Sequence, residues 1–560
     1  MKIFTLEKSV LKKLGGTFCC AVLSMSFFSC GSTDETERLY ASINYSQEDV
    51  VRDEIKAVES LAKKNPVEAL WRSTVLVENA PDISGTAEVF ADCEDLVLGL
   101  YRTSLSEKKY LDAIRLYDSL AAAGSKKISS LEKNPSELSA LVESSMPIEK
   151  SLPQNQKASQ MIKGTVTIFV DKGIKIEGGV GYKDTVLGSG FFITRDGFII
   201  TNHHVISDCV DPAYNGYARL YIKLAEDPDT RIPARVVGYD RTMDLALIKT
   251  EVDAPYIFTF GTSSELEIGD KIYVMGSPLG LDRTLTGGIV SATDRDLLSL
   301  GKVFQIDAAV SPGNSGGPMI DDQGRVQAVV FAGVQNYQGL NFAIPVEYLK
   351  AELAFLFGGG KRTHGWMEAF GKTRRMVGSG AKNEGAEILY VMPGGKASFA
   401  GLREGDVITA IDGSPVDSVD ALHLYLLGKM EGTIVRVTAE NPESGRKKTF
   451  PVYLSSRPEN PGYTFYTHDL ISSALYPILG MELVRSSTTN KKLYTVKKVI
   501  KNSSADTAGF SEGDPVQILQ CEPGEDKSVL QVGIYTKNKK KGFIDYGMTL
   551  AASLDGSQYF

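Results

Sequence analysis

The hydrophobic period of this chain changes along its length, and each period predicts a different kind of domain. Between residues 30 and 150, apolar side chains such as Val51, Ile55 and Val58 recur at helical spacing, which predicts an all-α domain of amphipathic helices. Residues 162–357 instead carry short β-type runs separated by turn residues, as in an all-β domain. Because 560 residues exceed what one compact core holds, we expect a multidomain protein.

An internal repeat divides the rest of the chain. The sequence Ala-Gly-Leu-Arg-Glu-Gly-Asp at residues 400–406 recurs as Ala-Gly-Phe-Ser-Glu-Gly-Asp at residues 508–514, an offset of 108 residues. A period of this length is that of one small domain. We therefore predict two tandem modules of the same kind, at residues 365–455 and 470–560.

Residues 1–29 have the composition of a signal peptide. Basic residues precede a mostly apolar stretch at residues 14–28, which is too short to span a bilayer comfortably. Ser29 and Cys30 then resemble the cleavage site of bacterial lipoproteins. We predict a lipid on Cys30 that tethers the protein to a membrane surface. Ordinary signal cleavage, which leaves Cys30 free, is the alternative.

The charge balance and the few cysteines exclude several classes of function. The net charge is −8, so nothing favours binding to the phosphates of nucleic acid. Outside the signal region only Cys93, Cys209 and Cys521 remain, and an odd, scattered set is not a disulfide framework. The sequence has no Cys-x-x-Cys and no His-Glu-x-x-His motif, so we predict neither a metal site nor a cofactor.

Three short segments of the β domain together contain the parts of a catalytic triad. His203 and His204 follow a β-type run, Asp244 opens an apolar strand, and Ser315 lies in the sequence Ser-Pro-Gly-Asn-Ser-Gly-Gly-Pro at 311–318. Each feature alone is more simply a turn, a cap or a structural histidine. In the order His204, Asp244, Ser315, at intervals of 40 and 71 residues, they predict a nucleophilic serine with its base and orienting acid.

The chemistry of a nucleophilic serine explains why these residue types belong together. A hydroxyl is a poor nucleophile at neutral pH unless a base removes its proton, and histidine suits that role because its pKa lies near neutrality. A carboxylate on the far ring nitrogen fixes the tautomer of the histidine. Backbone N–H groups must also meet the oxyanion, and Gly313 with Ser315 can supply that pair because glycine leaves the approach open.

These segments resemble those of the HtrA/Deg proteases, a bacterial quality-control branch of the chymotrypsin-like fold. The resemblance covers residues 162–357 and includes three further motifs: Gly276-Ser277-Pro278-Leu279-Gly280, Thr286-Gly287-Gly288-Ile289-Val290-Ser291 and Asn341-Phe342-Ala343-Ile344-Pro345. It implies a chymotrypsin-like double β-barrel. It also assigns the base to His204, because the histidine of the family directly precedes a valine, and leaves His203 as a neighbour.

The same resemblance implies where the primary specificity (S1) pocket lies. In the chymotrypsin-like fold, the position six residues before the nucleophile forms the floor of that pocket, and here it is Ala309. Alanine offers no carboxylate to pair with a substrate lysine or arginine. We therefore predict cleavage after small or medium apolar residues such as valine, alanine or leucine.

The two C-terminal modules resemble PDZ domains, the α+β modules that HtrA/Deg proteases append to the protease. Such domains bind C-terminal peptides by adding a strand at a sheet edge while backbone N–H groups hold the carboxylate. The second, more divergent module has the better binding loop, Leu479-Gly480-Met481, yet it is strand-like after Asp514, where a groove helix is expected. In the first module Glu368 occupies a loop position that is glycine in relatives. Peptide binding and a purely architectural role both remain open.

The combined features predict an exported serine endopeptidase of HtrA type that hydrolyses unfolded or damaged envelope proteins, with PDZ modules for recruitment or regulation. Its predicted location is the bacterial cell envelope, periplasmic or membrane-anchored. Family analogy implies a homo-oligomer, a trimer, whereas the N-terminal helices, which resemble tetratricopeptide (TPR)-like arrays, are not part of the usual family plan. The alternatives are a non-proteolytic chaperone or scaffold, and a signalling protease with one dedicated target.

Overall fold

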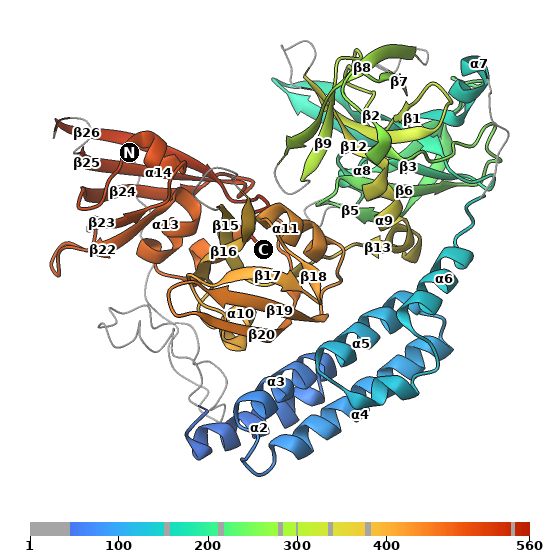
Figure 1. Cartoon of the computed structure of the whole chain (residues 1–560). Coiled ribbons are helices and arrows are strands. Elements are labelled where there is room, and N and C mark those ends of the chain that lie inside the picture. The colour runs from blue at the N-terminus through green and yellow to red at the C-terminus, as the bar shows by residue number, and fades with distance from the viewer. Residues whose placement is uncertain are drawn as a thin grey trace, which may run out of the picture. The chain divides into compact units, whose positions relative to one another are not determined.

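The computed structural model (Figure 1) describes residues 45–149, 157–210, 218–277, 284–297, 301–333, 340–375, 382–538, 542 and 544–560. The predicted signal peptide and Cys30 lie outside the described residues. Every helix within these ranges is too short or too polar to cross a membrane.

Helices make up the N-terminal region. They are α2 (Glu48–Ala62), α3 (Pro66–Asn79), α4 (Thr86–Ser106), α5 (Tyr110–Ala122) and α6 (Pro135–Ser145). Local sequence sets where they begin: the Asn65 side chain accepts a hydrogen bond from the Glu68 N–H at 3.2 Å, which caps α3. Asn134 and Glu137 form a reciprocal capping box at α6. Each helix packs against the next along the chain, so the predicted helical region is confirmed.

A closed β-barrel follows. Its strands are β1 (Thr165–Glu177), β2 (Val180–Phe192), β3 (Phe198–Thr201), β4 (Arg219–Lys223), β5 (Ile232–Asp240) and β6 (Leu245–Thr250), and α8 (His203–Val210) lies between β3 and β4 in sequence. The order is β5-β4-β1-β2-β3-β6, and β5 also pairs with β6, which closes the barrel. Alternate residues of β1, namely Val166, Ile168 and Val170, fill its core, as the two-residue period of a strand requires.

A second closed barrel completes the β domain. It contains β7 (Lys271–Gly276), β8 (Thr284–Asp296), β9 (Lys302–Ile306), β10 (Pro318–Ile320), β11 (Val326–Gly333) and β12 (Asn341–Pro345), in the order β10-β11-β12-β9-β8-β7. Helix α9 (Val346–Gly358) follows β12, and β13 (Gly360–Lys361) then pairs with β5 of the first barrel. A shared core with Phe191, Met275 and Ile344 joins the two barrels. The predicted double β-barrel is confirmed.

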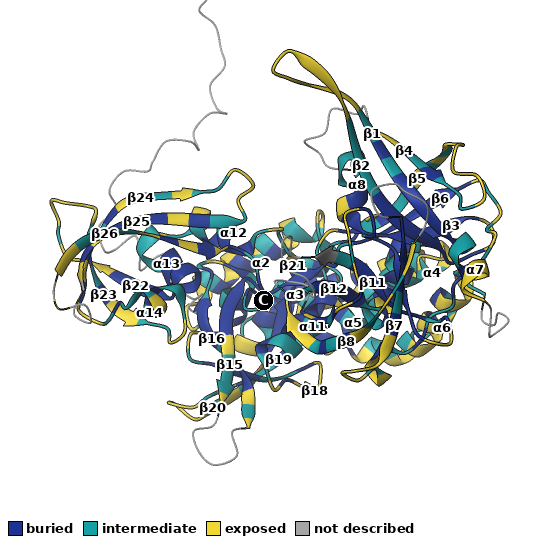
Figure 2. Ribbon diagram, turned by 90° about the horizontal axis from the view of Figure 1, so that it is seen from above, coloured by how far each residue is buried: buried dark blue, intermediate teal, exposed yellow. Residues whose placement is uncertain are grey.

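The hairpin of β1 and β2 extends beyond the first barrel (Figure 2). Its barrel end is buried, whereas its far end is exposed. Ile174, Ile176, Val180 and Tyr182 lie on this far end with large exposed fractions. The far end therefore contributes nothing to the barrel core.

The first C-terminal module is a six-stranded sheet with two short helices. Its main elements are β15 (Ala369–Arg375), β16 (Asn383–Val391), α10 (Lys396–Ala400), β17 (Val407–Ile411), α11 (Val419–Leu427), β19 (Ile434–Asn441) and β20 (Arg446–Tyr453), and its short strands are β14 (Gly365–Trp366), β18 (Ser414–Pro415) and β21 (Ser455–Ser456). The sheet order is β15-β16-β17-β19-β20, with β18 paired to β17 beside this path, so β15 is an edge strand. Helix α11 contacts β15 and β16.

The second module begins with helices and ends with a long meander. Its elements are α12 (Pro461–His468), α13 (Ile471–Leu479), β22 (Met481–Arg485), β23 (Leu493–Val499), α14 (Ser504–Ala508), β24 (Pro515–Pro523), β25 (Val529–Asn538) and β26 (Ile544–Ser553). The repeated Gly-Asp turns of the two modules, at Asp406 and Asp514, both precede a strand of the sheet. After Asp514 the described residues of this module contain strands and no groove helix.

The N-terminal helices share one hydrophobic core with the first module. The indole N–H of Trp71 donates a 2.8 Å hydrogen bond to the Pro451 carbonyl, and its ring lies 4.8 Å from that of Phe399. Ion pairs also join the helices to this module, including Asp118 with Lys429 at 2.8 Å. The helices therefore cover a face of this module, which the sequence did not reveal.

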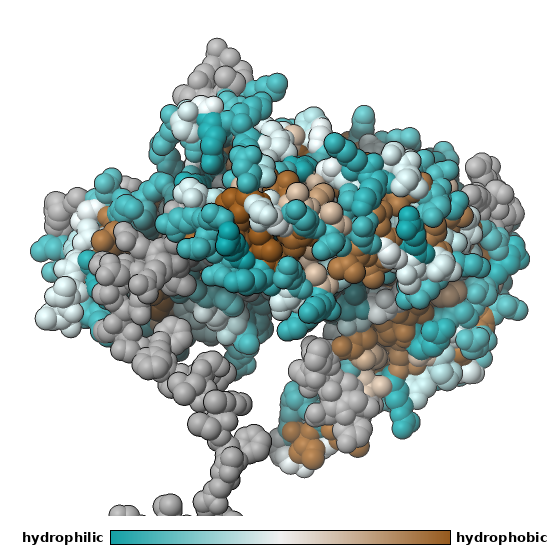
Figure 3. Space-filling view, turned by 90° about the horizontal axis from the view of Figure 1, so that it is seen from below, coloured by the Kyte–Doolittle hydropathy of each residue, from teal (hydrophilic) through white to brown (hydrophobic). Residues whose placement is uncertain are grey.

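The outer surface of the molecule is mixed in character. On the face seen in Figure 3, hydrophilic side chains cover most of the surface and apolar side chains gather in patches between them. Single exposed apolar residues, such as Ile268 and Leu519, are normal for a folded chain.

Candidate active site

Asp244 and His204 form the best-defined polar pair of the site. His204 lies in the first turn of α8, directly after β3, and Asp244 ends the turn between β5 and β6 with φ +50°. The Asp244 carboxylate accepts two hydrogen bonds from His204, one from its backbone N–H and one from ring Nδ1, both at 2.8 Å. Asn202 fixes the turn by donating to the Asp244 carbonyl at 2.8 Å. Because Nδ1 carries the proton toward Asp244, Nε2 is left as an acceptor.

The two adjacent histidines have opposite electrostatic surroundings. Burial lowers the pKa of His204, but the hydrogen bond and charge of Asp244 outweigh burial and raise it above the ordinary value. His203 is buried and stacks on Tyr239 at 5.3 Å, and burial lowers its pKa. Only His204 therefore has the orienting carboxylate that a general base needs.

The Ser315 loop is tightly bound to the first barrel. Ser189 of β2 holds it twice: its N–H donates to the Ser315 carbonyl at 2.7 Å, and its hydroxyl donates to the Gly313 carbonyl at 2.6 Å. Gly316 has φ +86°, and an added Cβ there would lie 2.2 Å from the Ser189 carbonyl and 2.3 Å from Thr201 Oγ1. Since Thr201 ends β3 just before the histidines, this loop lies against the segment that carries His204.

The Ser315 hydroxyl donates to the Phe331 carbonyl at 3.2 Å. Within the described residues it forms no hydrogen bond with His204. Catalytic hydrogen bonds of this kind are often long before substrate binds and shorten in the complex. The structure thus joins His204 to Asp244 directly and brings the Ser315 loop to the same barrel edge.

Gly313 has a backbone conformation that few other residues adopt. Its φ is +105°, a region that favours glycine. Among the described residues, the backbone N–H groups of Gly313 and Ser315 donate to no protein acceptor. The role of this pair as the oxyanion hole stays a prediction.

Ala309 is exposed, and its carbonyl accepts a hydrogen bond from the Thr286 hydroxyl at 3.0 Å. Residues 334–339, on the chain after β11, lie outside the described ranges. The assignment of Ala309 to the floor of the S1 pocket therefore stays a prediction.

The predicted carboxylate loop of the second module is engaged in local structure. Gly480 ends α13 with φ +81°, donates its N–H to the Tyr476 carbonyl at 3.0 Å and accepts from the Ile500 N–H at 2.8 Å. Leu479 and Met481 on either side are buried. Peptide binding by this loop also stays a prediction.

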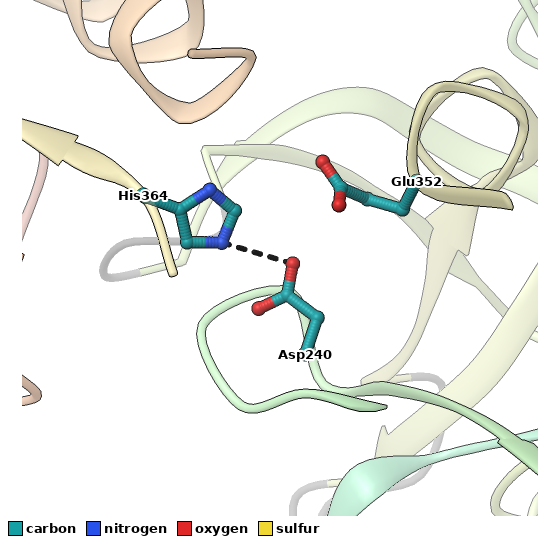
Figure 4. Close-up of side chains that lie close together, drawn as sticks. All are labelled: Asp240, Glu352 and His364. Atoms are coloured by element: carbon teal, nitrogen blue, oxygen red, sulfur yellow. Dashed lines mark hydrogen bonds and ion pairs between the residues drawn. The ribbon is translucent and has the colours of Figure 1, made fainter. Parts of the chain in front are cut away.

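A buried cluster of titratable residues, which no sequence motif indicated, lies near the Asp244 turn. Asp240, Glu352 and His364 place their ligand atoms within 4.8 Å of one another (Figure 4). His364 Nε2 lies 2.9 Å from Asp240, His364 Nδ1 lies 2.6 Å from the Leu427 carbonyl, and Arg362 pairs with Glu352 at 3.1 Å.

The cluster is better explained as an ion-pair network than as a metal centre. Burial disfavours the Asp240 carboxylate, but His364 outweighs burial and lowers its pKa. Burial and the charge of Asp240 raise the pKa of Glu352. Because each side chain already has a protein partner, a metal ion would have to displace at least one of the two His364 hydrogen bonds. Asp240 also accepts from the Met243 N–H at 3.1 Å, so the network holds the turn that carries Asp244.

A double barrel whose edge presents an Asp-oriented histidine and a glycine-framed serine defines the trypsin-like class of serine peptidase. The family described as "Trypsin-like peptidase domain" matches residues 188–329. The descriptions "PDZ domain" and "TP0546 family PDZ domain" match residues 387–441 and 462–554. The helical region matches "Domain of unknown function (DUF8517)" over residues 49–142. Both C-terminal modules are therefore PDZ domains.

Curated relatives place the chain within one family. The "Probable periplasmic serine endoprotease DegP-like" of Pseudomonas fulva is 31% identical over 359 residues, which cover 60% of this chain and 70% of that protein. The protein of the same description from Chlamydia trachomatis is 34% identical over 293 residues, and the match covers 50% of this chain and 56% of that protein. This chain belongs to the DegP-like branch of the HtrA serine proteases, so the resemblance drawn from the motifs is confirmed.

Among solved structures, "HtrA-type protease AlgW with decapeptide" is 23% identical, with a TM-score of 0.44, and covers 54% of this chain and 97% of that one.

Proposed function

We propose that this chain is a serine endopeptidase with Ser315 as nucleophile, His204 as general base and Asp244 as the residue that orients the base. The observation that carries the proposal is the pair of 2.8 Å hydrogen bonds by which Asp244 holds both the backbone and Nδ1 of His204. A scaffold or chaperone has no need of an oriented histidine against a glycine-framed serine. The non-proteolytic alternative is therefore not favoured.

The geometry suggests the order of proton transfers. With Nδ1–H held by Asp244, His204 Nε2 takes the proton of the Ser315 hydroxyl as Oγ attacks the peptide carbonyl. The N–H groups of Gly313 and Ser315 receive the resulting oxyanion, each worth about a hundredfold to a thousandfold in rate. His204 then gives its proton to the leaving amine, and water repeats the sequence to release the acyl group.

The substrates proposed are unfolded or damaged polypeptides of the bacterial cell envelope. Support comes from the names of the relatives, which describe periplasmic endoproteases. Ala309 as the floor of the S1 pocket favours cleavage after valine, alanine or leucine. A dedicated signalling target uses the same chemistry and is an alternative substrate for the same site.

Digestion of unfolded casein tests this function, with the cut sites mapped by mass spectrometry. The soluble protein should cleave mostly after small or medium apolar residues, and Ser315→Ala, purified alongside, should cleave nothing. Suppressed aggregation of casein without cleavage by the parent protein would favour the scaffold. A majority of cuts after arginine or lysine would rule out the role given to Ala309.

Three finer features also belong to the proposal. A lipid on Cys30 would hold the protein at a membrane of the envelope. Assembly as a trimer follows from family analogy. A TPR-like character for helices α2–α6 is supported by the packing of each helix against the next. Recruitment of peptides by the PDZ domains is supported by the way such domains bind peptides, as an added strand at a sheet edge.

A further inference from the structure

The edge strand β15 of the first PDZ domain is already paired with a segment from the far end of the chain. The Phe560 N–H donates to the Ala369 carbonyl at 3.0 Å, and the Ala369 N–H donates back to a Phe560 main-chain oxygen at 2.9 Å. Two residues along each strand, the Gly371 N–H donates to the Gln558 carbonyl at 3.0 Å. Phe370 and Tyr559 form the antiparallel bridge between them. This ladder is the pattern of β-strand addition, by which PDZ domains bind peptides.

The side chains of the segment alternate between two apolar sites. Phe560 is 1% exposed and belongs to the core that contains Leu422 and Leu426 of α11. An added Cβ on Gly371 would lie 2.9 Å from Cε1 and Cζ of the Phe560 ring, so the missing side chain at Gly371 leaves room for an aromatic ring. The Phe560 ring therefore packs against β15, within the hydrophobic core that also contains α11.

Tyr559 points to the opposite side, as alternation along a strand requires. Its ring lies 5.2 Å from that of Phe370 and 5.8 Å from that of Phe465 in the second PDZ domain. Its hydroxyl donates to the Ser553 carbonyl at 3.3 Å. The two aromatic residues thus fix the register of the segment on β15.

Polar contacts also hold residues 557–560 beside β15 and α11. The Ser557 hydroxyl donates to Asp420 of α11 at 2.8 Å. Glu368, the loop residue that replaces glycine, takes φ +66° and accepts from the Lys396 N–H at 2.7 Å. Its carboxylate is therefore engaged at α10, and the Phe560 main chain still bonds to the next residue, Ala369.

We propose that residues 557–560 are a resident ligand of a peptide groove between β15 and α11, and that this groove takes extended peptides with an aromatic residue in the position of Phe560. The groove of the first PDZ domain is thus closed in cis and opens to other peptides only when this segment leaves. A tethered ligand has an effective concentration on the order of 1 mM, so an external peptide must compete with it. This inference concerns peptide binding and stands independently of whether Ser315 is reactive.

Fluorescence anisotropy with a labelled Gly-Ser-Gln-Tyr-Phe peptide, the sequence of residues 556–560, tests the proposal. The parent chain and a variant lacking residues 557–560 are compared, both with Ser315→Ala so that the probe stays intact. The resident segment competes with the probe in the parent chain but is missing from the truncated chain. If the Kd of the groove for this sequence lies about a hundredfold below the effective concentration of the tethered segment, the truncated chain should bind the probe about a hundredfold more tightly than the parent. A probe with aspartate in place of phenylalanine should bind neither protein.

A milder variant keeps the test decisive where truncation harms folding. Ser557→Ala removes one rim hydrogen bond from the resident segment and leaves Asp420 free for the serine of the probe. Its affinity for the probe should rise about two- to tenfold. Ser528→Ala, whose hydroxyl donates to Asp526 in the second PDZ domain, should leave that affinity unchanged. Equal affinities of parent, truncated and Ser557→Ala proteins would overturn the proposal, as would a folded truncated chain that does not bind.

Discussion

Asp244 dominates the electrostatics of the proposed active site because both its carboxylate oxygens accept hydrogen bonds from His204. Its backbone has φ +50°, which orients the carboxylate across the turn toward α8. The raised pKa of His204 follows from this carboxylate, against the opposing effect of burial. A single residue therefore sets the tautomer, the orientation and the basicity of the proposed general base.

Replacing Asp244 should change both rate and pH dependence. His204 acts as a base only when neutral, so activity should be lost as pH falls through its raised pKa. Asp244→Asn should lower kcat about ten-thousandfold. It should also move the acid limb of the pH profile to lower pH, because the negative charge that raises the pKa of His204 is gone. The measurement is the pH profile of kcat/KM on a peptide substrate. Asp208→Asn, a carboxylate of the same helix that pairs with Lys172 at 3.2 Å, should leave the profile unchanged. An unshifted acid limb in Asp244→Asn would contradict the role given to Asp244.

The proposed triad residues could be singled out in the sequence because each lies in a short motif whose residue types are demanded by the chemistry. Ser189 could not, because its hydrogen bonds to Ser315 and Gly313 join segments more than 120 residues apart. The groove occupant was missed for the same reason: nothing in the composition of residues 557–560 indicates that they pair with β15.

Helix α11 ends where the protease barrels meet the first PDZ domain. Its last carbonyl, on Leu427, accepts from His364 at 2.6 Å and from Arg362 at 3.1 Å. His364 also pairs with buried Asp240 at the end of β5. These contacts tie the groove helix to the turn before Asp244 through side chains that are almost fully buried.

Removing His364 should destabilise this junction strongly. His364→Ala leaves the buried Asp240 carboxylate without its ring partner, and breaking a buried pair costs about 3–5 kcal/mol. The midpoint of urea unfolding should therefore fall clearly. Lys361→Ala, which removes an exposed lysine paired with Glu459 at 3.5 Å, should change stability by no more than about 0.5 kcal/mol. Equal midpoints for the two variants would contradict the structural role of the network.

At the scale of the whole molecule, the N-terminal helices and the first PDZ domain form one packed body. Sequence periodicity predicted the helices because they are amphipathic, but not their partner, because an apolar helix face does not specify what covers it. The double barrel and the tandem modules were predictable from motifs and the repeat. The shared core means that the helical region helps to hold the PDZ domain that carries the occupied groove.

Trp71 should hold this interface together. Trp71→Ala removes a fully buried ring and the hydrogen bond to the Pro451 carbonyl, a change that costs about 3–5 kcal/mol. Hydrogen exchange should then accelerate in α3 and β20 together. Leu96→Ala, at a side chain that is 47% exposed on α4, is the matched control and should leave exchange unchanged. Unchanged protection of β20 in Trp71→Ala would show that the helices do not support the PDZ domain.

Reaction of the folded protein with a fluorophosphonate probe, followed by mass spectrometry of the adduct, tests the catalytic assignment most directly. The probe reacts only with a serine activated by a base. The adduct should lie on Ser315, persist in Ser311→Ala, and be absent from both Ser315→Ala and His204→Ala. Labelling of another serine, or undiminished labelling of the His204→Ala protein, would contradict the proposed triad.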